Sequence, residues 1–135
     1  MKSTRGSGTK PVPRSRGRFA VSAGFKALVL DSLDDVPELT ARPMFGGLGL
    51  YSAGVFFAIV AADVLYFKVD AESRREYQRR GAPPFKPFPD RPPSHQYFAV
   101  PPGILENPSD LVTWARRAVR AASSRPGSRS RVSGR

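Results

Sequence analysis

Few side chains of this chain could carry out catalysis. Its 135 residues include no cysteine and one histidine, His95, so a thiolate nucleophile is excluded and a metal site would depend on carboxylates. His95 directly follows Ser94, and neighbouring positions rarely place a hydroxyl in line with its base. We therefore expect a protein that is not an enzyme and uses no cofactor or metal. An unrecognised enzyme is the least favoured alternative.

Acidic residues gather at one place in the chain. They lie at the end of the first predicted helix and just after it, and are Asp34 and Asp35 with Asp31 and Glu38 nearby. Carboxylates in a loop that ends a helix are usually solvated rather than paired for acid–base work. None of their spacings matches a metal-binding motif, so we interpret them as surface residues.

Glycines open the segment RPMFGGLGLYSAGVFFAIV, residues 42–60. A phosphate loop is not expected, because Gly47-x-Gly49 lacks the third glycine of the dinucleotide fingerprint and a strand, not a helix, is predicted to follow. A membrane span is not expected either, because the apolar run over 53–62 reaches only half of the ~20 residues required. We therefore expect the glycines to serve strands, at positions that need a positive φ or a close backbone approach.

The net charge of +11 belongs almost entirely to the two ends of the chain. Residues 1–20 contain six basic and no acidic side chains, and residues 123–135 contain four basic and no acidic ones. Both ends are rich in Ser, Gly, Pro and Arg and cannot bury enough apolar surface to offset the entropy of ordering. We predict disordered basic tails at 1–19 and 123–135, flanking one nearly neutral domain at 20–122.

The tails have two interpretations. Their arginines, including Arg14, Arg16 and Arg18, would attract nucleic acid weakly, without sequence preference and in a salt-sensitive way. The favoured alternative is a solubilising tail, since arginine-rich blocks are common and often nonspecific. The first tail lacks the apolar core of a secretory signal, and its glycines and prolines would break the helix of a transit peptide. We therefore expect a cytoplasmic protein that does not enter a membrane.

Hydrophobic spacing and turn residues outline the elements that position these side chains. A first helix is predicted over 20–33, with Leu28 on its apolar face. Strands are predicted in the segments ELTARPMF, LGLY, VFFAIV, LYFKV and, after a proline-rich stretch, QYFAV. Short turns at 52–54 and 62–63 make the middle strands an antiparallel meander.

Two further helices have clear ends. Asp70 is a good N-cap and Gly81 a good C-terminal stop for a short polar helix over 71–80. Asn107 is the expected N-cap of the helix in ENPSDLVTWARRAVRAA, whose apolar stripe contains Trp114 as a core anchor. The arginines of that helix are expected to face away from the core: Arg116, Arg117 and Arg120.

Arginines on the short polar helix could form an anion-binding patch. They are Arg74, Arg75, Arg79 and Arg80. The favoured alternative is a solvated helix with internal ion pairs, because Glu76 precedes Arg79 and Arg80 by three and four positions.

A proline-rich stretch, APPFKPFPDRPPSHQ, follows the polar helix. It should form an extended connection resembling polyproline II. Pro84-x-x-Pro87 formally matches a PxxP ligand, as does a second pair further on. A loop held by Phe85 and Phe88 packing inward is favoured over that interpretation.

Several ordered blocks resemble the N-terminal domain of the TfoX/Sxy family. They are ARPMFGGLGLYSAGVFFAIVAADVLYFKVD, YQRRGAPPF, YFAVP and LENPSDLVTWARRAV, which together span most of residues 20–122. The resemblance implies a link to transcription, since the competence regulators of this family are co-activators that act with the cyclic-AMP receptor protein. Those regulators carry a second, C-terminal domain, and we expect a basic tail at the point where it would begin.

Most residues of the family motif are expected to define the fold. They are Met44, Phe45, Gly46, Gly47, Tyr51, Lys68, Gly81, Phe85, Tyr97, Pro101 and Trp114. Among them, Tyr51 and Lys68 are polar enough to be candidates for a binding face.

These observations together predict an α+β domain. We expect a small antiparallel sheet of four to five strands, with the N- and C-terminal helices packed on one face and a short polar helix between strands. The expected function is a non-enzymatic binding and regulatory module that acts through a protein partner, as a monomer or homodimer. Nonspecific nucleic-acid association through the tails is the alternative.

Overall fold

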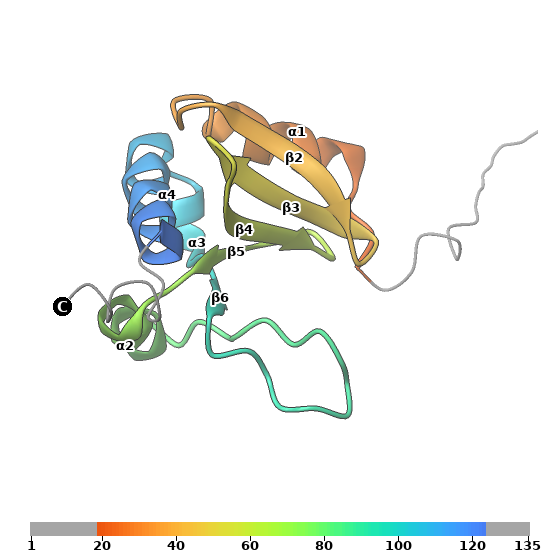
Figure 1. Cartoon of the computed structure of the whole chain (residues 1–135), viewed down its shortest axis with the longest axis vertical. Coiled ribbons are helices and arrows are strands. Elements are labelled where there is room, and N and C mark those ends of the chain that lie inside the picture. The colour runs from red at the N-terminus through yellow and green to blue at the C-terminus, as the bar shows by residue number, and fades with distance from the viewer. Residues whose placement is uncertain (1–18, 124–135) are drawn as a thin grey trace, which may run out of the picture.

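The computed structural model describes residues 19–123, which form the α+β fold expected from the sequence (Figure 1). The elements, in chain order, are α1 (Ala23–Ser32), β2 (Leu39–Met44), β3 (Gly47–Ser52), β4 (Val55–Ala61), β5 (Val64–Lys68), α2 (Ala71–Arg79), β6 (Tyr97–Ala99), α3 (Pro102–Leu105) and α4 (Pro108–Ser123). The five strands make one antiparallel sheet in the order β2-β3-β4-β5-β6. The predicted meander is therefore confirmed, with β6 added at its far edge.

Two-residue turns join the first four strands. Their central residues all have positive φ, as type I′ turns require: Phe45 (55°) and Gly46 (85°), Ala53 (49°) and Gly54 (83°), Ala62 (51°) and Asp63 (58°). Type I′ turns match the right-handed twist of paired strands, which explains why such short connections can close these hairpins. The turns predicted at 52–54 and 62–63 are confirmed.

The main core lies on one face of the sheet, beneath α1 and α4 (Figure 1). Leu50, Phe57 and Phe67 of the sheet are fully buried there and belong to the same cluster as Trp114 of α4. The prediction that both terminal helices pack on one face, with Trp114 as an anchor, is confirmed. Leu28 is an exception, because its side chain is 52% exposed although the helical pattern placed it on the apolar face.

Capping fixes the ends of α2. The Asp70 carboxylate accepts a hydrogen bond from the backbone N–H of Ser73 at 2.9 Å, and the Ser73 hydroxyl accepts one from the N–H of Asp70 at 3.0 Å. This reciprocal pair is a capping box, with Ser73 in the place usually taken by Glu or Gln. Gly81 follows the helix at φ 75°, so both predicted ends are confirmed.

Gly46 and Gly47 act as the sequence predicts, each for a different reason. Gly46 has a positive φ in the turn between β2 and β3. Gly47 is buried, and a Cβ there would run into the backbone carbonyl oxygen of Val60. The first glycine therefore allows the turn, and the second allows the chain to pass close to β4.

The proline-rich loop differs from its prediction at one aromatic residue. Phe85 is 3% exposed and forms backbone hydrogen bonds from its N–H to the Tyr97 carbonyl at 2.8 Å and from the Ser94 N–H to its own carbonyl at 2.7 Å. Phe88 is 46% exposed, so the prediction that it packs inward is wrong. The two hydrogen bonds hold the loop at Phe85, and the chain beyond leaves the sheet.

Candidate binding surface

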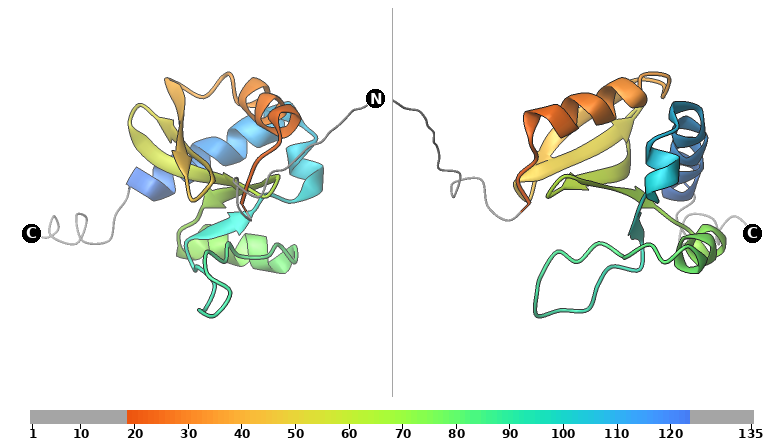
Figure 2. Two further views of the ribbon diagram at one scale, coloured as in Figure 1. Left: turned by 90° about the vertical axis from the view of Figure 1, so that its right-hand side faces the viewer. Right: turned by 180° about the vertical axis from the view of Figure 1, so that it is seen from behind.

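Among residues 19–123, no helix contributes to the hydrophobic cluster on the second face of the sheet. Figure 2 shows the proline-rich loop on this side, opposite α1. Part of the face is closed by Phe19 and Phe85, which pack with Ile59 and Ala61 of β4. Phe19, placed in the N-terminal tail by the sequence, thus contacts the sheet. The remainder of this face carries partly buried aromatic side chains.

Three of those side chains form a line across the sheet, here named the aromatic row: Tyr51, Phe56 and Tyr97. The ring centroids of Tyr51 and Phe56 lie 5.2 Å apart, and those of Phe56 and Tyr97 lie 5.6 Å apart. All three residues are partly buried. They come from β3, β4 and β6, so only the folded sheet assembles them.

A cation lies over each terminal ring of the aromatic row. The Arg42 guanidinium carbon lies 5.4 Å from the Tyr51 ring centroid, and the Lys68 Nζ lies 5.7 Å from that of Tyr97. Both distances are within the range of cation–π attraction. The surface therefore combines three aromatic rings with two positive charges.

Gly49 makes room for this arrangement. A Cβ at Gly49 would lie 3.0 Å from Cε1 of Phe56 and 3.3 Å from the terminal carbon of Met44. Both neighbours are side-chain atoms on the second face, so a larger residue would push the Phe56 ring away. This glycine therefore serves the aromatic row rather than a phosphate loop.

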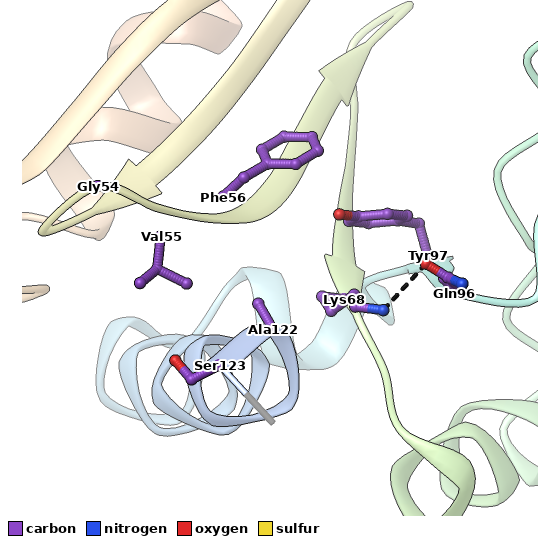
Figure 3. Close-up of a pocket in the computed structure, with 8 residues that line it drawn as sticks. All are labelled: Gly54, Val55, Phe56, Lys68, Gln96, Tyr97, Ala122 and Ser123. Carbon is purple, nitrogen blue, oxygen red and sulfur yellow. Dashed lines mark hydrogen bonds between the residues drawn. The ribbon is translucent and has the colours of Figure 1, made fainter. Parts of the chain in front are cut away.

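A hollow of about 650 Å³ opens beside the aromatic row (Figure 3). Its walls come from the start of β4, from β5 and β6 and from the last residues of α4: Gly54, Val55, Phe56, Lys68, Gln96, Tyr97, Ala122 and Ser123. Lys68 Nζ donates a hydrogen bond to Oε1 of Gln96 at 3.0 Å, drawn as a dashed line in Figure 3. The hollow thus combines two rings with one cation.

Burial shifts the pKa of both titratable groups in the hollow, Lys68 and Tyr97. It lowers the pKa of Lys68, as does the nearby positive charge of Arg74, while Asp70 opposes them weakly. It also raises the pKa of Tyr97 to about 12, with a smaller contribution from Tyr51. Tyr97 is therefore a neutral hydroxyl at pH 7, and an anion that reached Lys68 would restore stabilisation that burial has removed.

The sequence identified two members of this surface and missed the others. Tyr51 and Lys68, the predicted binding-face residues, both lie on the second face, one in the aromatic row and one at its end. Arg42, Phe56 and Tyr97 were not predicted as ligand contacts. Strand alternation gives the face of each residue, but the partners depend on pairing between strands, which the sequence does not show.

The predicted arginine patch on α2 is divided among different contacts. Arg74 Nε donates a hydrogen bond to the His95 carbonyl at 2.9 Å. Arg80 lies 3.8 Å from the Glu76 carboxylate and 5.1 Å from the Trp114 ring centroid. Arg75 and Arg79 are exposed, and no ion pair within residues 19–123 includes them. Arg14, Arg16 and Arg18 lie outside the described residues.

Arg117 of α4 contradicts the expectation that it faces away. It donates a hydrogen bond to Oε1 of Glu76 at 2.8 Å, and its guanidinium carbon lies 5.2 Å from the Trp114 ring centroid. Glu76 therefore pairs more closely with Arg117 than with Arg80 of its own helix. The pair joins α2 to α4, a contact that spacing along one helix cannot predict.

The residues first considered for catalysis lie on the surface of the described part. His95, Asp31, Asp34 and Asp35 are all exposed. Within residues 19–123 no group of three or more His, Asp or Glu side chains could hold a metal ion. Over the same residues, no helix combines the length and the apolar character that crossing a bilayer requires.

Comparison with known proteins assigns the chain to a family. No curated protein matches it. Residues 31–122 match the family described as the TfoX N-terminal domain, and this match runs from the end of α1 to the last turn of α4. It includes all five strands and therefore the whole aromatic row. The chain belongs to the TfoX N-terminal domain family.

Proposed function

We propose that this domain is a non-enzymatic binding and regulatory module that acts in the cytoplasm through a protein partner. The observation that carries the proposal is the exposure of the Phe45 side chain. Its side chain is 58% exposed although it belongs to the family motif. An exposed phenylalanine adds little to the core, so its presence favours a role in binding.

The backbone at Phe45 strengthens this interpretation. Its φ of 55° is unusual for a bulky side chain, and Asn or Gly would suit the first position of a type I′ turn better. A left-handed conformation of this kind costs on the order of 1 kcal/mol. Unfavourable backbone conformations persist more often where a side chain serves function.

Phe88, in the proline-rich loop, is a second exposed aromatic residue. It lies three positions after Phe85, whose ring centroid is 6.5 Å from that of Phe45. We name Phe45 and Phe88 the exposed aromatic pair. Prolines surround Phe88 in sequence, and an extended proline-rich loop fits an aromatic-lined groove on a partner at low entropic cost. We therefore propose a partner with such an apolar groove.

The test replaces Phe45 by asparagine, which suits its backbone conformation. Phe45→Asn and Phe88→Ser should each abolish capture of the partner from a native lysate after nuclease treatment. Leu28→Ser is the matched control, because Leu28 is also exposed, at 52%, but lies on α1. That variant should retain the partner.

Stability measurements separate this proposal from a fold-defining role of Phe45. Phe45→Asn relieves about 1 kcal/mol of strain and loses about as much partial burial, so the free energy of unfolding should stay within about 1 kcal/mol of the parent value. A loss of about 3 kcal/mol or more, as for a buried phenylalanine, would show that Phe45 serves the fold. Unchanged capture by Phe45→Asn would count against the binding role.

The family supports a regulatory role, since the resemblance to competence regulators implies action with a transcription factor. Nonspecific nucleic-acid association through the basic ends is the second candidate, favoured by the position of the charge outside residues 21–122. In that case affinity should fall steeply with salt and show no sequence preference. Neither candidate function includes a catalytic step.

The proposed oligomeric state is a monomer or a homodimer. Edge strand β2 disfavours pairing of two sheets at Pro43. Since Met44 and Gly47 close a two-residue hairpin, they form the hydrogen-bonded pair, and Pro43 in the next pair directs its nitrogen to the open edge. A proline there removes a donor from that edge. Light scattering of the full chain distinguishes the two states.

A further inference from the structure

We infer that the aromatic row is a stacking platform for single-stranded nucleic acid. This activity goes beyond the protein partner proposed above and uses a different surface, the second face of the sheet. It also differs from attraction to the basic ends alone, because rings recognise exposed base faces rather than phosphate charge.

The rings have the arrangement that base stacking requires. Tyr51, Phe56 and Tyr97 are partly buried, which holds each ring in place while part of it remains accessible. Neighbouring rings are tilted by 35° and 38°, so their faces are not closed against each other as in a parallel stack. Aromatic side chains on an antiparallel sheet bind unpaired bases in this way and tolerate any sequence.

The charges beside the row suit a phosphate backbone. Arg42 and Lys68 lie at cation–π distances from its two terminal rings, Tyr51 and Tyr97. None of the described residues that line the adjacent hollow is acidic. A nucleic-acid strand laid along the row would place bases over the rings and phosphates within reach of these two cations.

The described part of the chain begins and ends near strand β4, which crosses this face. Phe19 packs near the end of β4, since its carbonyl accepts a hydrogen bond from the Ala62 N–H at 3.1 Å. Ser123 lines the hollow where β4 begins. Residues 1–18 and 124–135, with six and four basic side chains and no acidic ones, are joined to the domain at these two places.

The two sources of affinity favour different nucleic acids. Basic side chains alone favour a duplex, whose charge density is higher than that of a single strand. Aromatic rings favour a single strand, because the base faces of a duplex already stack on one another. A preference for the single strand is therefore diagnostic of the aromatic row.

The experiment uses the full chain and two labelled probes, an oligothymidine of about 15 nucleotides and a hairpin duplex of similar length. Fluorescence anisotropy at physiological salt should show tighter binding to the oligothymidine. Phe56→Leu and Tyr97→Leu should each weaken that binding roughly 5- to 100-fold and leave duplex binding unchanged. Tyr97→Phe, which keeps the ring, should retain the preference.

Phe88→Leu is the matched control, since it removes an exposed aromatic ring outside the row. It should leave both affinities unchanged. Replacing Arg14, Arg16 and Arg18 by glutamine should weaken binding of both probes. It should also reduce the slope of log affinity against log salt concentration for the single strand by about 2. The preference for the single strand should survive that replacement.

Two results would overturn the inference. One is equal or tighter binding of the duplex by the parent chain; the other is a single-strand preference that both leucine variants retain. If a leucine variant does not fold, Lys68→Gln provides the second measurement, with an expected fall of about 0.7 in the single-strand salt slope. Loss of the inference would leave the protein-partner proposal intact, because partner capture is measured after nuclease treatment with Phe45 and Phe88 variants.

Discussion

Replacing Gly47 by alanine tests whether the glycines of the opening motif serve the sheet. Gly47 begins β3 and pairs with Met44. A Cβ at this position would overlap the carbonyl oxygen of Val60 and lie 3.1 Å from the carbonyl oxygen of Phe19 and 3.3 Å from Cα of Ala61. All three atoms belong to the backbone, so no rotation of a side chain can relieve the overlap.

The expected loss of stability follows from those contacts. Either β3 moves away from β4, or Phe19 leaves the sheet, and both changes break packing. Overpacking of this kind costs about 3 kcal/mol. Gly24→Ala is the matched control, because nothing lies within 4 Å of a Cβ there and the residue is in helix α1. That change should stabilise the domain by about 0.5–1 kcal/mol.

Urea and thermal unfolding, both followed by the fluorescence of Trp114, the only tryptophan of the chain, measure the free energy of unfolding and the melting temperature of both variants. Gly47→Ala should lower the melting temperature by more than about 10 °C, and Gly24→Ala should raise it by a few degrees. A loss below about 1 kcal/mol for Gly47→Ala would refute the argument from packing. Gly47 would then need another explanation, such as close approach of a ligand.

Two other predictions concern contacts that the structure revealed. Hydrogen bonding to Arg117, with a smaller contribution from the charges of Arg117 and Arg80, lowers the pKa of Glu76. The ionised Glu76 carboxylate therefore stabilises the fold above the pKa that it has in the unfolded chain, and this stabilisation is lost as pH falls through its pKa in the folded protein. Glu76→Gln should therefore lower the free energy of unfolding by about 0.5–1 kcal/mol at pH 7. Measured over a series of pH values, the difference in unfolding free energy from the parent should vanish below the pKa of Glu76 in the folded protein. A constant difference at all pH values would contradict the ion pair. Phe85→Ala should cost about 3–4 kcal/mol because the ring is buried against Tyr66 and Phe19 at centroid distances of 5.0 and 5.5 Å. Phe88→Ala, in the same loop, should change the free energy of unfolding by less than about 0.5 kcal/mol, and similar losses for both would argue that Phe88 also packs inward.

Features that depend on neighbouring residues could be predicted from the sequence. The caps at Asp70 and Asn107, the stop at Gly81 and the short turns all follow from contacts within four positions. The alternation of Tyr66 and Lys68 with Leu65 and Phe67 gave the faces of β5 in the same way.

Predictions from the sequence were wrong where tertiary packing decides which of several similar side chains is buried or paired. Phe85 and Phe88 lie in one proline-rich loop, and their local sequence does not show which ring meets the sheet. Arg117 lies on the polar side of its own helix, yet α2 approaches and Glu76 pairs with it at 2.8 Å across a separation of 41 positions. The helical pattern describes one helix and holds no information about the neighbour.

The candidate binding surface shows the same division. By itself the sequence determined the strands, their turns, the face on which each side chain lies and the family block that contains Tyr51 and Lys68, because these properties follow from local periodicity and composition. Only the tertiary structure decided that Phe56 stands opposite Tyr51 after a register shift in β3 and β4, and that Tyr97 reaches Phe56 from β6. The physical reason is that hydrogen bonding between strands sets their register: a shift within the β3–β4 hairpin places Phe56 opposite Tyr51, and pairing of β6 with β5, which are far apart in sequence, brings Tyr97 to the same face.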